Sequence, residues 1–75
     1  MTIDPEGPVP LWQQVADIIR QQIESGELPK GRRVPSENTL AQQYGIARGT
    51  AKRALDSLVA DRLVVRVQGK GSFVA

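Results

Sequence analysis

Side chains that can bind an anion or read the edge of a base gather in one short stretch, which contains Arg48, Gly49, Thr50, Lys52 and Arg53. A guanidinium can donate two hydrogen bonds to guanine O6 and N7, and such a pair is worth about 1–3 kcal/mol of discrimination. Lysine, arginine and threonine also contact phosphate oxygens. The chemistry that these residue types favour is the binding of a nucleic acid.

Other chemistries lack the residues that they need. The 75-residue chain has no cysteine and no histidine, which removes disulfides, thiol nucleophiles, imidazole bases and nearly all transition-metal sites. Acid–base catalysis would need two carboxylates in one cleft, and Asp56 and Asp61, five positions apart, pair poorly on a helix. The glycines around Lys70 lack the longer frame of a phosphate-binding loop. We therefore expect no enzyme, no metal and no cofactor.

Two short helices must position the basic side chains. Ser36 is a candidate N-cap, and the charge of Glu37 suits the positive end of a helix dipole. Gly45 can take the left-handed conformation that ends a helix. The apolar face between these ends consists of Leu40, Ala41 and Tyr44.

A second helix is expected to follow over about residues 47–61. Its apolar stripe can only be core and consists of Ala51, Ala54, Leu55 and Leu58. Two helices joined by a short turn that contains glycine are typical of a helix-turn-helix, whose second helix enters the DNA major groove. Asp56 lies further along the exposed face, where it would repel phosphate. Contact is therefore expected at the start of this helix.

Charge is distributed unevenly along the chain, although the net charge is only +2. Residues 1–29 carry five acids and one base, and residues 30–75 carry nine bases and three acids. A basic half that also bears the helix pair is typical of a nucleic-acid-binding protein. A charged surface that is merely solvated is the alternative interpretation of this asymmetry.

The N-terminal part predicts an arm and a supporting helix. Residues 1–9 are expected to form a flexible arm, and residues 10–75 a single domain. The pattern from Leu11 to Ser25 is amphipathic, and Gly26 ends it. The polar face is rich in glutamine and mixed in sign, which argues against a helix on a membrane surface. No stretch is long and apolar enough to cross a bilayer.

The segments around the helix pair predict a small sheet. Arg33 and Val34 form a candidate short strand, and the basic residues of this connector either bind phosphate or solvate a loop. Residues 63–67 predict a strand, 68–71 a turn and 72–74 a returning strand. Lys70 at the tip suits the minor groove or flanking phosphates, unless the turn alone explains the glycines. The expected fold class is mainly α with a small β-hairpin: a three-helix winged helix-turn-helix.

The stretch from Pro10 to Val74 resembles the DNA-binding domain of the GntR family of bacterial transcription regulators. Its markers are an aromatic residue and glutamine after Pro-Leu, the run IxxGxLxxGxxxPSExxLA, an Arg-x-Thr that opens the recognition helix, and the final GKGxFV. Any one marker is weak. All of them in order at the family's spacing are specific.

The resemblance implies roles for individual residues. The Pro-Ser-Glu segment of this family lies near phosphate, the third helix reads bases, and the wing glycine enters the minor groove. Carried onto this sequence, these roles fall on Ser36 and Asn38 at phosphate, Arg48 and Thr50 at the operator, Lys52 at phosphate or base, and Gly69 and Lys70 in the wing. The predicted DNA-binding set is completed by Arg33, Gly49 and Arg53.

Three positions depart from the family pattern. Ala47 stands where serine or threonine is usual, and a lost cap costs about 0.5–2 kcal/mol. Gly49 loosens the first turn by about 1 kcal/mol relative to alanine. Ala51 replaces a larger apolar residue. We expect a weakened recognition helix that stays in place, so amide exchange through residues 48–52 should be fast.

The resemblance also implies partners. It predicts a homodimer on a palindromic operator in double-stranded DNA, a usual role as repressor, and a bacterial cytoplasmic location. Family members normally carry a C-terminal effector domain. We expect no small-molecule effector for this chain alone, and a monomer in free solution. A winged helix that docks an acidic protein partner is the alternative function, and salt dependence on duplex DNA separates the two.

Overall fold

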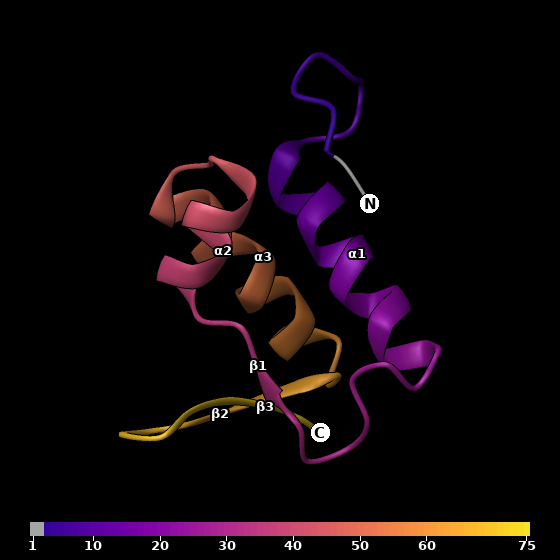
Figure 1. Cartoon of the computed structure of the whole chain (residues 1–75), viewed down its shortest axis with the longest axis vertical. Helices are drawn as coiled ribbons and strands as arrows, with labels where there is room; N and C mark the ends of the chain where they lie inside the picture. The colour runs from indigo at the N-terminus through magenta and orange to yellow at the C-terminus, as the bar shows by residue number, and fades with distance from the viewer. Residues whose placement is uncertain (1–2) are drawn as a thin grey trace.

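The computed structural model describes residues 3–75 (Figure 1). In chain order its elements are α1 (Leu11–Glu24), β1 (Arg33–Val34), α2 (Glu37–Tyr44), α3 (Arg48–Ala60), β2 (Val64–Val67) and β3 (Gly71–Val74). The strands form one antiparallel sheet in the order β1-β3-β2. This arrangement confirms the expected fold class, a three-helix winged helix-turn-helix with a small sheet.

The helix α1 follows the amphipathic pattern of its sequence. Its buried residues are Val15, Ala16, Ile18 and Ile19. At its C-terminal end the Ser25 N–H donates to the Gln21 carbonyl at 2.9 Å. Gly26 follows with φ +86°, a conformation that favours glycine, so the helix ends where the sequence predicts.

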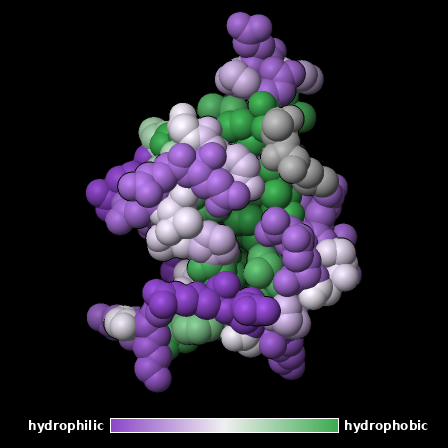
Figure 2. Space-filling model, in the orientation of Figure 1, coloured by the Kyte–Doolittle hydropathy of each residue, from purple (hydrophilic) through white to green (hydrophobic). Residues whose placement is uncertain are grey.

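The helix α3 lies at the centre of the molecule and contacts α1, α2 and β2. Its predicted core stripe is at most 2% exposed at any position. The surrounding core residues are Val15, Ile19, Val34, Leu40, Val64 and Val74. Figure 2 shows hydrophilic side chains over α2 and over the sheet, with hydrophobic atoms visible between them. Tyr44 borders this core, and burial raises the pKa of its phenol above the ordinary value.

The sheet has β3 as its central strand. In register, Val64 opposes Val74 and Val67 opposes Gly71, while Arg33 on the other side of β3 opposes Phe73. The strand β2 begins one residue later than predicted, because the Leu63 N–H still donates to the Leu58 carbonyl at the end of α3. The strand β3 begins one residue earlier than predicted, at Gly71.

The described part of the N-terminal segment is hydrogen-bonded to α1. The Gln14 side-chain amide donates to the carbonyls of Asp4 and Val9, both at 2.7 Å, and its oxygen accepts from the Asp4 N–H. The flexibility expected for residues 1–9 stays a prediction, and residues 1–2 lie outside the described part. Within residues 3–75, no helix has the length and apolar character that crossing a membrane requires.

Candidate nucleic-acid interface

The start of α3 is exposed and basic. Ala47 is the N-cap residue, with an extended backbone and a side chain that has no polar atom, so it cannot cap the helix. The Ala47 carbonyl accepts from the N–H groups of Thr50 and Ala51, both at 3.1 Å. The N–H groups of Arg48 and Gly49 precede the first intrahelical bonds. These two donors therefore remain available to a ligand.

The predicted side chains of α3 divide between two directions. Arg48, Gly49 and Lys52 are exposed, and Thr50 is half-buried in the first turn. The Arg53 guanidinium lies over the Trp12 ring of α1, 4.7 Å from its centroid, a cation–π contact. Arg53 is therefore the member of the predicted set whose charged group is directed toward α1.

The start of α2 is capped as predicted. The Ser36 hydroxyl accepts from the Thr39 N–H at 3.2 Å and donates to the Thr39 hydroxyl at 3.0 Å. Glu37 occupies the first turn, where its charge suits the helix dipole. Gly45 ends the helix in the left-handed region, with φ +63°. Both predicted ends of α2 are thus present, and Gly45 opens the turn that leads to α3.

The wing is the hairpin formed by β2 and β3. Its turn closes through a hydrogen bond from the Lys70 N–H to the Val67 carbonyl at 3.0 Å, and Gly69 takes φ +80°. Gly71 has φ +116°, and a Cβ built there would lie 3.2 Å from the Arg33 guanidinium. The Arg33 side chain therefore rests against the base of the wing, at a site where only glycine fits without displacement.

The start of α3 and the tip of the wing lie on the same side of the molecule, at the left of Figure 1. Between them is a basin of about 240 Å³. We call it the arginine basin. Its lining consists of Arg33, Val34, Ser36, Glu37, Asn38, Arg48, Leu55, Arg66, Gly71 and Ser72.

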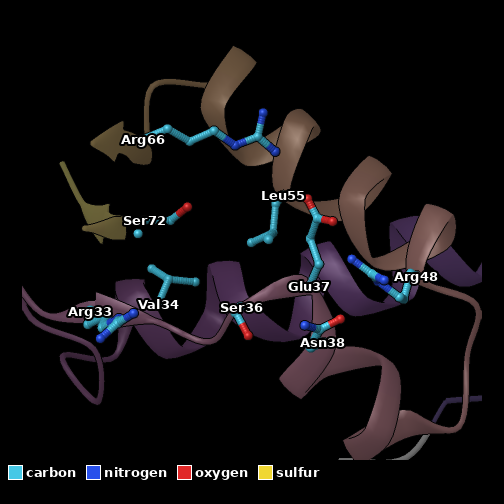
Figure 3. Close-up of a pocket in the computed structure, with 10 residues that line it drawn as sticks. Arg33, Val34, Ser36, Glu37, Asn38, Arg48, Leu55, Arg66 and Ser72 are labelled. Atoms are coloured by element: carbon cyan, nitrogen blue, oxygen red, sulfur yellow. The ribbon is translucent and has the colours of Figure 1, made fainter. Parts of the chain in front are cut away.

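The arginine basin brings together predicted residues from three elements. Figure 3 shows Arg48 and Arg66 approaching it from opposite ends, with Leu55 between them. Three arginines and a single carboxylate, that of Glu37, line it. This balance of charge favours an anion. Lys52, Gly69 and Lys70 lie outside the basin, on the exposed face of α3 and at the wing tip.

Two charged lining residues, Glu37 and Arg66, were missed by sequence reasoning. Glu37 was assigned only to the dipole of α2, and Arg66 was assigned only to a strand. Arg66 is ion-paired with Asp56 of α3, so the acid expected to repel phosphate has a basic partner. The alternation of a strand could have found Arg66, because it lies two residues after the buried Val64 and so shares its face.

The described residues place no metal site in this region. Within residues 3–75, no group of three or more acidic side chains is arranged to hold a metal ion. The charged side chains around the basin are three arginines and one glutamate. This excess of positive charge favours an anion, as does the basic stretch at residues 48–53.

Comparison with known proteins decides the family. Residues 11–74 match the family model described as bacterial regulatory proteins, gntR family. The chain belongs to the gntR family. This family is one of regulatory proteins, in agreement with the expectation that the chain is not an enzyme.

Relatives of this gntR-family chain include a curated repressor and two solved structures. The histidine utilization repressor of Pseudomonas putida is 51% identical over 70 residues, which is 93% of this chain and 28% of that protein. YtrA from Sulfolobus acidocaldarius, a GntR-family transcription factor, is 36% identical with a TM-score of 0.89, over 97% of this chain and 77% of that one. This chain thus spans little more than a quarter of the length of the Pseudomonas relative.

The third relative is AraR(DBD), whose structure was solved in complex with operator ORR3. It is 36% identical to this chain and superposes with a TM-score of 0.87. The match covers 100% of this chain and 90% of that one. A chain with this fold is thus known in complex with an operator.

Proposed function

We propose that this chain binds double-stranded DNA sequence-specifically, as the DNA-binding domain of a GntR-type transcriptional repressor. The observation that carries the proposal is the match to AraR(DBD) in complex with operator ORR3, which extends over the whole chain. The basic start of α3 and the wing tip lie on one side, as a duplex would require (Figure 1). The Pseudomonas relative that supports the regulatory role is named a repressor.

The proposed contacts follow from the chemistry of each side chain. The first turns of α3 enter the major groove, where Arg48 donates to a guanine edge and Thr50 and Lys52 bind base or phosphate. Gly49 lets the backbone approach closely. The wing tip, at Gly69 and Lys70, reaches into the minor groove.

Backbone phosphates are the proposed ligands of the remaining residues. Ser36 and Asn38 begin α2 at the edge of the arginine basin, and Arg33 lies beside the wing base. Arg53 contacts phosphate from the Trp12 side of α3. These contacts set the register of the domain on the duplex without reading its sequence.

The proposal extends to assembly and location. Two copies bind a palindromic operator as a homodimer, and the free chain is a monomer without a small-molecule effector. Residues 1–9 form an arm and residues 10–75 the domain. Because bacterial DNA lies in the cytoplasm, the protein acts there.

Selection of binding sites from a random duplex pool at moderate salt tests the proposal. An inverted repeat is the expected product, and its half-site spacing will give the geometry of the dimer. The affinity should fall with salt at a log–log slope of about −0.9 per phosphate contact. A pool that returns no motif, with binding that salt abolishes, would overturn sequence-specific recognition. Absence of duplex binding at low salt would instead favour docking to an acidic protein partner.

A further inference from the structure

An ion pair joins the recognition helix to the wing. The Arg66 guanidinium on β2 lies 2.5 Å from the Asp56 carboxylate on α3, and the two side chains are 41% and 47% exposed. Ser72 of β3 is paired in register with Arg66 on one side and with Val34 on the other, so these three side chains lie on the same face of the sheet. Val34 is buried in the core, so this is the inner face, from which Arg66 can reach α3. The pair therefore links the two elements that are proposed to contact DNA.

Asp56 occupies a position where an acid needs compensation. Arg48, Lys52 and Asp56 follow one another at intervals of four, so they lie along one face of α3. A carboxylate on a face that meets phosphate repels it. Within residues 3–75, the base at ion-pair distance from Asp56 is Arg66. The wing thus supplies the charge that balances the acid of the helix.

The tip of the wing has few other supports. The short strand β1 pairs with β3 only at Ser72 and Phe73, so Gly71 and the turn before it belong to a two-stranded ribbon. A hairpin of two strands alone is marginally stable in water. The ion pair between Asp56 and Arg66 lies where this ribbon leaves the sheet.

We propose that Asp56 and Arg66 are positioning residues, which fix the wing against the recognition helix so that helix start and wing tip meet one duplex together. The inference rests on the DNA-binding function proposed above and specifies how its two contacts are held in register. The carboxylate and the guanidinium touch each other, and the residues that they position touch DNA.

For Asp56→Asn, a pure charge effect and a loss of positioning predict different changes in DNA affinity. Asp56→Asn removes a negative charge from the exposed face, which by itself tightens binding to every duplex. Loss of positioning instead weakens binding to the preferred duplex relative to a scrambled one. The ratio of the two affinities therefore distinguishes a positioning role from a simple charge effect.

The first experiment measures that ratio for the duplex selected from the random pool and for a scrambled duplex of equal length. Asp56→Asn and Arg66→Gln should each lower it about two- to fivefold, the range expected for an exposed ion pair. The double variant should lose no more than either single one, because both remove the same contact. Arg66→Lys, which keeps the pair, should stay near the wild-type ratio.

Matched controls carry the same charge changes away from the pair. Glu24→Gln at the end of α1 and Arg62→Gln after α3 should shift both duplexes together and leave the ratio unchanged. Additive losses in the double variant, or a ratio in Asp56→Asn equal to that of Glu24→Gln, would overturn the proposal.

A second measurement needs no DNA. Residual dipolar couplings of the free chain report the orientation of the β2–β3 hairpin relative to α3. The wild type and Arg66→Lys should share one orientation, and Asp56→Asn and Arg66→Gln should change it or average it. Unchanged couplings in both would refute positioning. If the wild type selects no duplex, the DNA-binding proposal fails, and the couplings still decide whether the pair sets the wing.

Discussion

The first turns of α2 and α3 border the same arginine basin, yet they are built in opposite ways. The start of α2 has a serine whose hydroxyl accepts from the Thr39 N–H, followed by the acidic Glu37. The start of α3 has Ala47, which cannot cap, followed by the basic Arg48. Acid near the positive end of a helix dipole stabilises it, and a base there does the reverse.

This difference distinguishes a helix start that is stabilised within the chain from a helix start that is open to a ligand. The Ser36 hydroxyl gives the Thr39 N–H a side-chain partner within the chain, so the start of α2 is stabilised without a ligand. The first N–H groups of α3, at Arg48 and Gly49, lie on the exposed surface beside a cation. Phosphate or a base edge can satisfy them, which makes the stability of α3 depend on its ligand.

The largest effect is expected from Arg48→Ala, which removes the proposed reading side chain from the start of α3. Loss of a bidentate guanine contact should reduce the binding free energy for the selected duplex by about 1–3 kcal/mol and change that for a scrambled duplex little. Arg33→Ala is the comparison, because loss of a phosphate contact should weaken both duplexes alike. Fluorescence anisotropy with both duplexes measures this. Equal loss of specificity in the two variants would contradict the assignment of Arg48.

Ala47→Asp would make the start of α3 resemble that of α2. The new carboxylate should cap the helix and raise the free energy of unfolding by about 0.5–2 kcal/mol. It should also weaken duplex binding at least about fivefold, since a surface carboxylate facing phosphate costs about 1 kcal/mol. Thermal denaturation measures the change in stability, and fluorescence anisotropy measures the change in duplex affinity.

The control for this variant is Ala47→Ser, a cap without charge. It should give the gain in stability with little loss of binding. A fall in DNA affinity as large as that of Ala47→Asp would mean that the free N–H groups, and not repulsion, are what the duplex requires.

Ser36→Ala would make the start of α2 resemble that of α3. Removing the acceptor of the Thr39 N–H should cost about 1 kcal/mol of unfolding free energy, which lowers the Tm by about 4–8 °C in a domain of this size. Ser36→Asp keeps an acceptor and should retain most of the stability. A Tm that Ser36→Ala leaves unchanged would show that this cap contributes nothing.

The smallest effect is expected at Gly49. A Cβ there meets open space, so Gly49→Ala should stabilise α3 by about 0.5–1 kcal/mol through helix propensity. Gly45→Ala should instead destabilise the fold, because Gly45 holds φ +63°, a conformation that is costly for alanine. Urea denaturation measures both. Slow amide exchange through residues 48–52 in the wild type would contradict the expected looseness of this turn.

Features set by neighbouring residues could be predicted from the sequence. The cap at Ser36, the left-handed Gly45 and the buried stripe of α3 depend on local chemistry and helical period, and all three are present. The hairpin was found within one residue at each strand, since glycines and β-branched residues mark it. The basin brings together Ser36, Asn38 and Arg48, which the sequence predicts at the starts of the two helices.

Features set by distant partners could not be predicted. Arg20 of α1 pairs with Asp61 beyond α3, and Arg53 stacks on Trp12, although nothing local marks either contact. Arg62 takes φ +63° directly after α3, at a helix end where glycine is usual, so its residue type does not mark this turn. The partner of Asp56 was likewise hidden, because it comes from a strand whose inner face only the folded sheet defines.

The central position of β3 has a consequence for folding during synthesis. Domains are made from the N-terminus onward, and β3 leaves the ribosome after the three helices and the other two strands. Until Phe73 emerges, Arg33 has no partner in register, and the two outer strands cannot join. The helices can pack before that moment, but the sheet closes in a single late step. A nascent chain stalled before Gly71 would carry a recognition helix without a wing.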